Sequence, residues 1–163
     1  MTGATMVKHV VARRSIKVGL NLILWIAFAV TAFGFFLGGF IGKWLVDMGR
    51  PQEGIAVYRS ALMIYPWNAA MRNDLGLALL AHGDAKGAVD ELRKAIALRP
   101  DVGKLHNHLG FALFKDGDIE GAIQEFQEAV RLAPEYEDYR RDLDMAIVVR
   151  KKERSSDTAG GSK

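Results

Sequence analysis

The sequence contains no cysteine, which excludes a disulfide-stabilised scaffold, a catalytic thiol, an iron–sulfur site and a lipid-modified anchor cysteine. Proline is also scarce, with 4 residues among 163. Charge of one sign is not in large excess, because 22 basic and 19 acidic side chains leave a net charge of +3. So mild an excess does not favour nucleic-acid binding. Half of the residues are hydrophobic and they are unevenly distributed, which disfavours a soluble enzyme.

The hydrophobic residues gather in one stretch near the N-terminus. Residues 18–42 contain no charged side chain, whereas the rest of the chain has an ordinary proportion of charge. A helix of these 25 residues is roughly 37 Å long, enough to cross a hydrocarbon core of about 30 Å. Lys43 and Trp44 follow the stretch, as is typical of a membrane interface. We therefore predict a basic segment over residues 1–17 and a single transmembrane helix over residues 18–42.

A cleaved signal peptide is the alternative, with Val30-Thr31-Ala32 as its small-residue cleavage site. The stretch is longer than the hydrophobic core of a signal peptide, about 7–15 residues, so we favour an uncleaved anchor. Four basic residues and no acid precede the stretch, whereas residues 43–60 carry three basic residues. The positive-inside rule then predicts a cytoplasmic N-terminus and, in a bacterial inner membrane, a periplasmic C-terminal part. The opposite topology, with a cytosolic receptor, stays open.

Glycine recurs every fourth residue within this stretch, at Gly34, Gly38 and Gly42. Small residues at this spacing let a second helix approach closely within lipid. We therefore expect these glycines to pack against a partner helix, in a homo-oligomer or a larger membrane complex. The alternative is that glycine is simply common in membrane helices.

A repeat of 34 residues covers most of the remaining chain. Pro66, Pro100 and Pro134 are spaced by this interval. Aligning the chain on them superposes further small or apolar residues, including Gly42, Gly76 and Gly110; Leu45, Leu79 and Leu113; Gly49, Gly83 and Gly117; Gly54, Ala88 and Ala122; and Ala61, Ala95 and Ala129. The apolar residues within each unit have the spacing of two helices, which a glycine separates and a proline ends. The small residues stand where paired helices must cross closely.

This pattern resembles the tetratricopeptide repeat, whose signature positions are present as Leu75, Gly76, Gly83, Asp84, Ala88, Ala95 and Pro100, and again as Leu109, Gly110, Gly117, Asp118, Ala122, Phe126, Ala129 and Pro134. The resemblance implies an all-α solenoid of three units over residues 35–68, 69–102 and 103–136. The first helix of the first unit is then merged with the membrane segment, without a flexible linker. Residues 137–154 are predicted to form a polar-faced capping helix, and residues 155–163 a disordered tail. Arg72 and His106 replace a frequent tryptophan, and we expect this change to loosen the core slightly.

The resemblance assigns the concave, ligand-binding face to the first helix of each pair. This face is predicted to present Asn73, Leu77, Leu80, Lys104, Asn107, His108, Phe111, Phe114 and Arg141. An apolar groove with polar edges suits an extended peptide or a helix of a protein partner. The alternative is that the capping helix closes the groove. Chaperone-tail-binding members of the family use a basic, asparagine-rich clamp, which Asn73 and Lys104 match only in part, so that ligand is not predicted.

No arrangement of side chains in the sequence predicts catalysis, a cofactor or a metal site. His106 and His108 are two residues apart on a helix and point away from each other. The carboxylates of Asp90, Glu91, Glu125 and Glu128 alternate with basic residues, as on solvated helix faces. The predicted function is non-catalytic: a membrane-tethered adaptor or scaffold in the assembly or biogenesis of a membrane or exported protein complex. The alternative is a permanent accessory subunit of a respiratory or photosynthetic membrane enzyme complex, held through its glycines.

Overall fold

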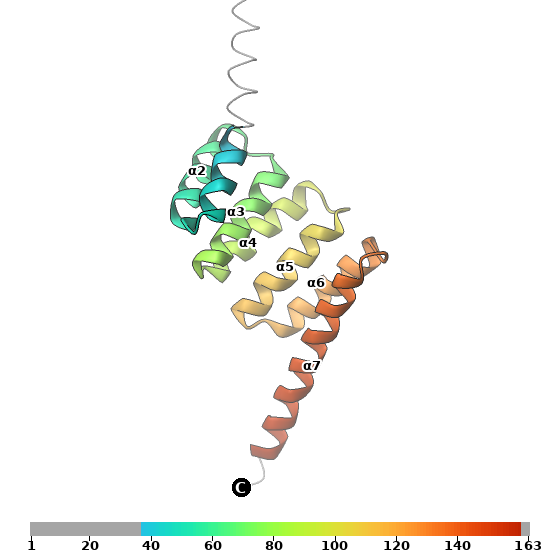
Figure 1. Ribbon diagram of the computed structural model, residues 1–163. Helices are drawn as coiled ribbons and strands as arrows, with labels where there is room; N and C mark the ends of the chain where they lie inside the picture. Colours follow the sequence, from blue (N-terminus) through green and yellow to red (C-terminus); the bar gives the residue numbers. More distant parts are fainter. Residues whose placement is uncertain (1–36, 161–163) are drawn as a thin grey trace, which may run out of the picture. The chain divides into compact units, whose positions relative to one another are not determined.

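The computed structural model describes residues 37–160, and their side chains as far as Ser155. Every regular element in this part of the chain is an α-helix. A helix over residues 37–47 precedes six others: α2 (Pro51–Ile64), α3 (Ala69–His82), α4 (Ala85–Leu98), α5 (Gly103–Asp116), α6 (Ile119–Leu132) and α7 (Glu137–Gly160). Consecutive helices pack in antiparallel pairs, and the pairs stack into a solenoid (Figure 1).

The turns inside the second and third pairs have the same construction. Gly83 and Gly117 adopt φ angles of +91° and +92°, and their backbone N–H groups donate to carbonyls in the last turns of α3 and α5. Asp84 and Asp118 then cap α4 and α6, because each carboxylate accepts a hydrogen bond of 2.9 Å from the backbone N–H three residues later. The glycine predicted to separate the two helices is thus a left-handed cap in both units, and a capping aspartate completes the reversal.

Paired helices cross at a glycine of the first helix, which faces a large buried side chain of the second, in the pairs Gly42–Tyr58, Gly76–Leu92 and Gly110–Phe126. A Cβ atom on Gly110 would lie 2.6 Å from the Phe126 ring, and one on Gly76 would lie 2.8 Å from the Leu92 side chain. Neither distance leaves room for a methyl group. The predicted close crossing at this position of the repeat is therefore confirmed in all three units.

A polar clamp occupies the position where the family often has tryptophan. The Arg72 guanidinium donates to the Pro66 carbonyl at 2.9 Å and lies 2.7 Å from the Glu91 carboxylate. Thirty-four residues later, the same contacts recur between the His106 ring and its partners, at 3.1 Å from the Pro100 carbonyl and 2.7 Å from the Glu125 carboxylate. The clamp joins both helices of a unit to the preceding turn, so the core at this position is not loosened.

The clamp also corrects the prediction for the second-helix carboxylates. The side chains of Glu91 and Glu125 are only 16% and 29% exposed, because each is paired with a first-helix cation or imidazole. They therefore do not lie on solvated faces, although Glu128, paired with Arg131 on its own helix, is more exposed at 35%.

α7 covers the end of the solenoid, as predicted for a capping helix. Ala146 is fully buried, Leu143 and Ile147 pack against the core, and Arg150 bonds Glu120 of α6 at 3.1 Å. The helix continues to Gly160, six residues beyond its predicted end at residue 154. The reason is that residues 155–159 contain neither glycine nor proline, so nothing ends the helix before Gly160. The predicted tail is thus helical over residues 155–160.

Several sequence predictions lie outside the described residues: the basic segment 1–17, most of the predicted transmembrane helix 18–42, and Gly34. Within residues 37–160, no helix is long and apolar enough to span a membrane. Residues 37–42 of the apolar stretch belong to the first helix of the first unit.

Candidate functional site

The first helices of successive units lie along one face and are joined by hydrogen bonds between units. His108 Nδ1 of α5 lies 2.6 Å from the amide oxygen of Asn73 in α3, and Asn107 of α5 donates to the Asp142 carboxylate of α7 at 2.8 Å. The two residues of each bond are 35 apart in the sequence, so Asn73 and Asn107, at equivalent positions of their units, link α3 to α5 and α5 to α7 through different chemical groups. Asn73 and Asn107 are buried as a result, with 6% and 5% exposure.

Burial and a nearby cation keep His108 in its neutral form. Burial, followed by the positive charge of Lys104, lowers the pKa of His108 from 6.5 to about 4. A neutral ring with a proton on Nδ1 can donate to the Asn73 amide oxygen, which fixes the tautomer.

An apolar hollow of about 380 Å³ opens between α3 and α5, beside the turn that follows α3. It is lined by Leu77, Leu80, Gly83, Ala85, Phe111 and Lys115. The Phe111 ring forms part of its wall and packs edge-on against Phe126, with ring centres 5.2 Å apart at 81°. The hollow is large enough for one bulky apolar side chain, and Lys115 places a cation at its edge.

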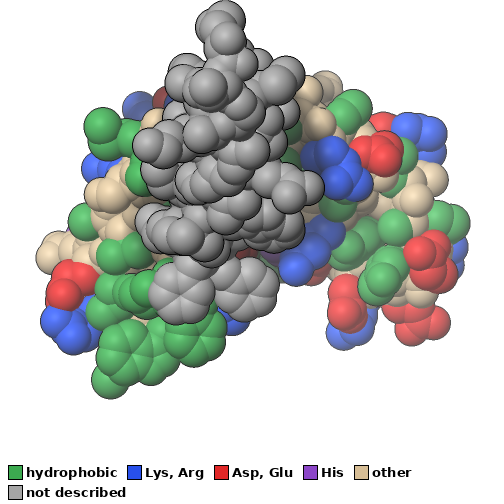
Figure 2. All heavy atoms as spheres, turned by 90° about the horizontal axis from the view of Figure 1, so that it is seen from above, with side chains coloured by type: hydrophobic (Ala, Val, Ile, Leu, Met, Phe, Trp, Pro, Cys, Tyr) green, Lys and Arg blue, Asp and Glu red, His purple; other side chains and the backbone are tan. Residues whose placement is uncertain are grey.

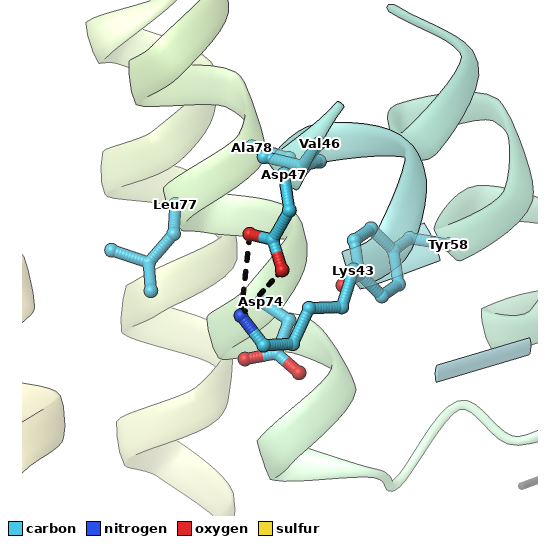
Figure 3. Close-up of a pocket in the computed structure, with 7 residues that line it drawn as sticks. All are labelled: Lys43, Val46, Asp47, Tyr58, Asp74, Leu77 and Ala78. Atoms are coloured by element: carbon cyan, nitrogen blue, oxygen red, sulfur yellow. Dashed lines mark hydrogen bonds and ion pairs between the residues drawn. The ribbon is translucent and has the colours of Figure 1, made fainter. Parts of the chain in front are cut away.

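A smaller and more polar hollow of about 140 Å³ lies between the helix over residues 37–47 and α3 (Figure 3). Its lining includes two carboxylates, Asp47 and Asp74, and the Lys43 ammonium, which pairs with Asp47 at 3.1 Å. Burial raises the pKa of Asp74, against the opposing effects of the Asn73 hydrogen bond and of Lys104 and Lys43. Burial, with Asp74 and Asp47 nearby, also raises the pKa of Tyr58. Leu77 lines both hollows, so they adjoin along the same face.

The predicted groove residues divide into three groups. Leu77, Leu80 and Phe111 come together in the apolar hollow. Asn73, Asn107 and His108 are used instead to bond neighbouring helices, so they are not free groove donors. The partners of Asn73 and Asn107 are His108 and Asp142, which lie 35 residues later and differ in type. An alignment on the 34-residue repeat does not reveal such pairs.

The remaining three predicted residues lie outside the hollows. Phe114 is half-buried and packs against the core, whereas Lys104 is exposed. Arg141 is exposed and paired with Asp138 on its own helix. Conversely, Lys115 lines the apolar hollow, and Asp47 and Asp74 line the polar one, although none of the three belongs to the predicted groove. A polar residue one turn after an apolar groove residue, as Lys115 is after Phe111, was the available signal.

The structure describes two of the three glycines that were predicted to pack against a partner helix, Gly38 and Gly42. A Cβ atom on Gly38 would lie 2.9 Å from Ala61, and one on Gly42 would lie 2.7 Å from the Tyr58 ring. Both glycines therefore face α2 of the same chain. Among the described residues, no group of three or more histidines or carboxylates is arranged to hold a metal ion.

A profile of the tetratricopeptide repeat matches residues 41–102 and 73–137, which together make up more than half of the chain. The chain belongs to the tetratricopeptide repeat family. This assignment agrees with the three aligned units, the glycine crossings and the stacked helix pairs. A comparison with curated proteins found no matching relative.

Solved structures share this fold. The second tetratricopeptide domain of human RPAP3, in complex with an HSP70 peptide, has a TM-score of 0.68 at 19% identity, covering 71% of this chain and 97% of that one. MamA from Desulfovibrio magneticus gives 0.67 at 25% identity, covering 74% and 68%. The O-GlcNAc transferase of Thermobaculum terrenum gives 0.67 at 26% identity, covering 72% of this chain but 22% of the enzyme.

Proposed function

We propose that this tetratricopeptide repeat protein is a non-catalytic, membrane-tethered adaptor that holds a protein partner beside the bilayer. Its proposed role is in the assembly or biogenesis of a membrane or exported protein complex. The proposed location is a bacterial inner membrane, with the N-terminus in the cytoplasm and the repeats in the periplasm. The charge-free stretch over residues 18–42 supports the tether, and the four basic residues before it support the orientation.

The observation that carries the adaptor role is the apolar hollow between α3 and α5. Leu77, Leu80 and Phe111 line it although an isolated solenoid gains nothing by leaving such side chains partly open to solvent. Structural neighbours in this family include domains of RPAP3 bound to HSP70 and HSP90 peptides. The hollow supports binding of a peptide or helix that inserts a large apolar side chain.

The charges around the hollow define the partner further. Lys115 lies at its edge, and Lys104 is exposed on the same helix. A partner segment with one bulky apolar residue and an acidic residue close to it would place a carboxylate against Lys115. The buried state of Asn73 and Asn107 argues against a chaperone-tail clamp, because their amides already bond His108 and Asp142.

The alternative role, as a permanent accessory subunit held through Gly34, Gly38 and Gly42, has less support. Gly38 and Gly42 face α2 of the same chain, so a partner helix would have to displace α2 to reach them.

Site-specific photo-crosslinking tests the adaptor role. A photoreactive amino acid at Leu80, which lines the hollow, is expected to capture a membrane or exported protein in cells. The matched control is the same amino acid at Gln124, which is exposed on α6, away from the first helices. Capture from position 80 that is abolished by Lys115→Glu, with none from position 124, would support the proposal. Equal capture from both positions, or capture of α7 of the same chain alone, would refute it.

A further inference from the structure

Four large hydrophobic side chains stand exposed at one end of the first unit. Phe40 is 66% exposed, and Met63, Ile64 and Trp67 are 86%, 68% and 80% exposed. We name these four residues the apolar rim. Figure 2 looks onto the end of the solenoid where α2 ends, and hydrophobic side chains gather along one edge of this face. Singly exposed hydrophobic residues are common, but four large ones that are more than 60% exposed in one unit require a partner.

The contacts between the first two helices fix the position of the rim. Gly42 faces Tyr58, and Gly38 faces Ala61, so the two helices run antiparallel. Met63, Ile64 and Trp67 follow Ala61, and therefore extend beyond Gly38, toward the end at which the chain enters the first helix. Gly38 itself belongs to the charge-free stretch over residues 18–42. The rim thus lies at the end of the first unit where the charge-free stretch enters the first helix.

The later units provide an internal comparison, because they place other residues at the same positions of the fold. Trp67 corresponds to Asp101 and Glu135, and Met63 corresponds to Ala97 and Arg131. The fold therefore does not require an apolar residue at either position.

The surrounding sequence shows the same difference between units. Residues 60–71 contain no charged side chain, whereas the corresponding segments 94–105 and 128–139 each contain several. The apolar character is confined to the unit that continues the charge-free stretch.

We propose that the apolar rim is immersed in the lipid headgroup and upper acyl region of the membrane into which residues 18–42 insert. The inference rests on the proposed membrane tether. Tryptophan is enriched at membrane interfaces because its ring is apolar and its N–H is polar, and Trp67 is the most prominent ring of the rim. A tether plus an immersed rim makes two attachments, which fix the tilt of the solenoid against the bilayer.

Depth-dependent fluorescence quenching tests the proposal on the full chain. The protein has 3 tryptophans, so Trp25→Phe and Trp44→Phe leave Trp67 as the sole indole emitter. The protein is reconstituted into vesicles of phosphatidylethanolamine and phosphatidylglycerol, with or without lipids brominated high on the acyl chain. Brominated lipid is expected to remove most of the Trp67 emission, while acrylamide in the water removes little.

Flotation of the same vesicles separates the two possible failures. Failure of the chain to float with the vesicles would overturn the tether, and this inference with it. If the chain floats but Trp67 is quenched by acrylamide and not by brominated lipid, only this inference is overturned. Shielding of Trp67 from both quenchers would mean that protein, such as a second copy or a partner, covers the rim, which also overturns it.

A charge placed in the rim supplies a second test. Met63→Arg introduces the residue that the third unit has at this position, so it is compatible with the fold. It is expected to reduce quenching of Trp67 by brominated lipid. Ala97→Arg makes the same change at the exposed equivalent position in the second unit and is expected to leave quenching unchanged. Equal effects of the two variants would contradict lipid contact by the rim.

Discussion

Single glycines decide how closely the paired helices approach. A Cβ atom on Gly110 would overlap the Phe126 ring at 2.6 Å, so Gly110→Ala is expected to overpack the core. Overpacking costs about 1–3 kcal/mol, and the better helix propensity of alanine offsets at most about 1 kcal/mol of that. Urea unfolding of the full chain in detergent should therefore show a lower midpoint.

Gly39→Ala is the matched control for this prediction. A Cβ atom there would meet nothing within 4 Å, so only the gain in helix propensity remains. The midpoint is expected to stay the same or rise. An equal loss in both variants would mean that the effect does not come from contact with Phe126.

His108 makes stability depend on pH. Its folded pKa of about 4 lies below the ordinary 6.5, so the folded protein binds the proton less readily than the unfolded chain. The stabilisation is complete above pH 6.5 and is lost as the pH falls toward 4, by up to about 1.4 kcal/mol per pH unit. Urea midpoints of the wild type and His108→Gln, measured from pH 7.5 to pH 4.5, should show a steeper acid loss in the wild type, on the order of this slope.

The difference between those two proteins isolates the histidine. The raised pKa of Asp74 acts in the opposite direction, because it favours the folded state as the pH falls, but Asp74 is present in both. Parallel pH profiles would contradict a buried, neutral His108.

At the scale of the helices, the polar clamp replaces an aromatic contact with directed bonds. Glu91→Gln leaves the Arg72 guanidinium, 17% exposed, without its carboxylate. Leaving a buried charged donor poorly satisfied costs about 1–3 kcal/mol, and this loss should appear in the urea midpoint. Glu128→Gln breaks an ion pair on the exposed face of α6 and is expected to change the midpoint little. A similar effect of both variants would show that the clamp contributes no more than a surface pair.

The residues of α7 that pack against the core lie in its first part. A chain ending after Tyr136 loses the burial of Ala146 and the packing of Leu143 and Ile147. Since a fully buried aliphatic side chain contributes about 1.5–3 kcal/mol, this truncation is expected to give an unstable or aggregating protein. A chain ending after Ser155 keeps these contacts and the Arg150–Glu120 bond, so its thermal midpoint should not change. Thermal unfolding of the two truncations, followed by circular dichroism, checks both expectations.

At the scale of the whole molecule, the absence of cysteine makes topology directly measurable. Thr2→Cys and Ser162→Cys each introduce the sole thiol of the chain. With the N-terminus in the cytoplasm, a membrane-impermeable maleimide should label position 162 in intact cells with a permeable outer membrane, and position 2 only after the inner membrane is lysed. The reverse pattern would place the repeats in the cytosol.

Repetition explains which parts of the molecule the sequence could predict. Glycine, alanine and proline recur in columns because the same helix crossing is built three times, so helix pairs, turns and close contacts follow from the spacing alone. The hydrogen bonds between successive first helices could not be predicted from the spacing, because Asn73 and Asn107 bond residues of different types in the next unit. For the same reason Asn73, Asn107 and His108 do not join Leu77, Leu80 and Phe111 in the apolar hollow. The end of α7 was misjudged because polar composition does not by itself stop a helix.

The glycine column also sets the length of the solenoid. Continuing it by 34 residues from Gly110 leads to Asp144, an exposed residue of α7. In each earlier unit, the glycine at this position leaves room for a large side chain of the second helix. α7 has a charged side chain there, which would be costly to bury, so it cannot pack against a following helix in the same way. Growth of the array therefore ends at this carboxylate. A lineage that gained glycine here and one more helix would have a longer protein, and with it an additional recognition surface.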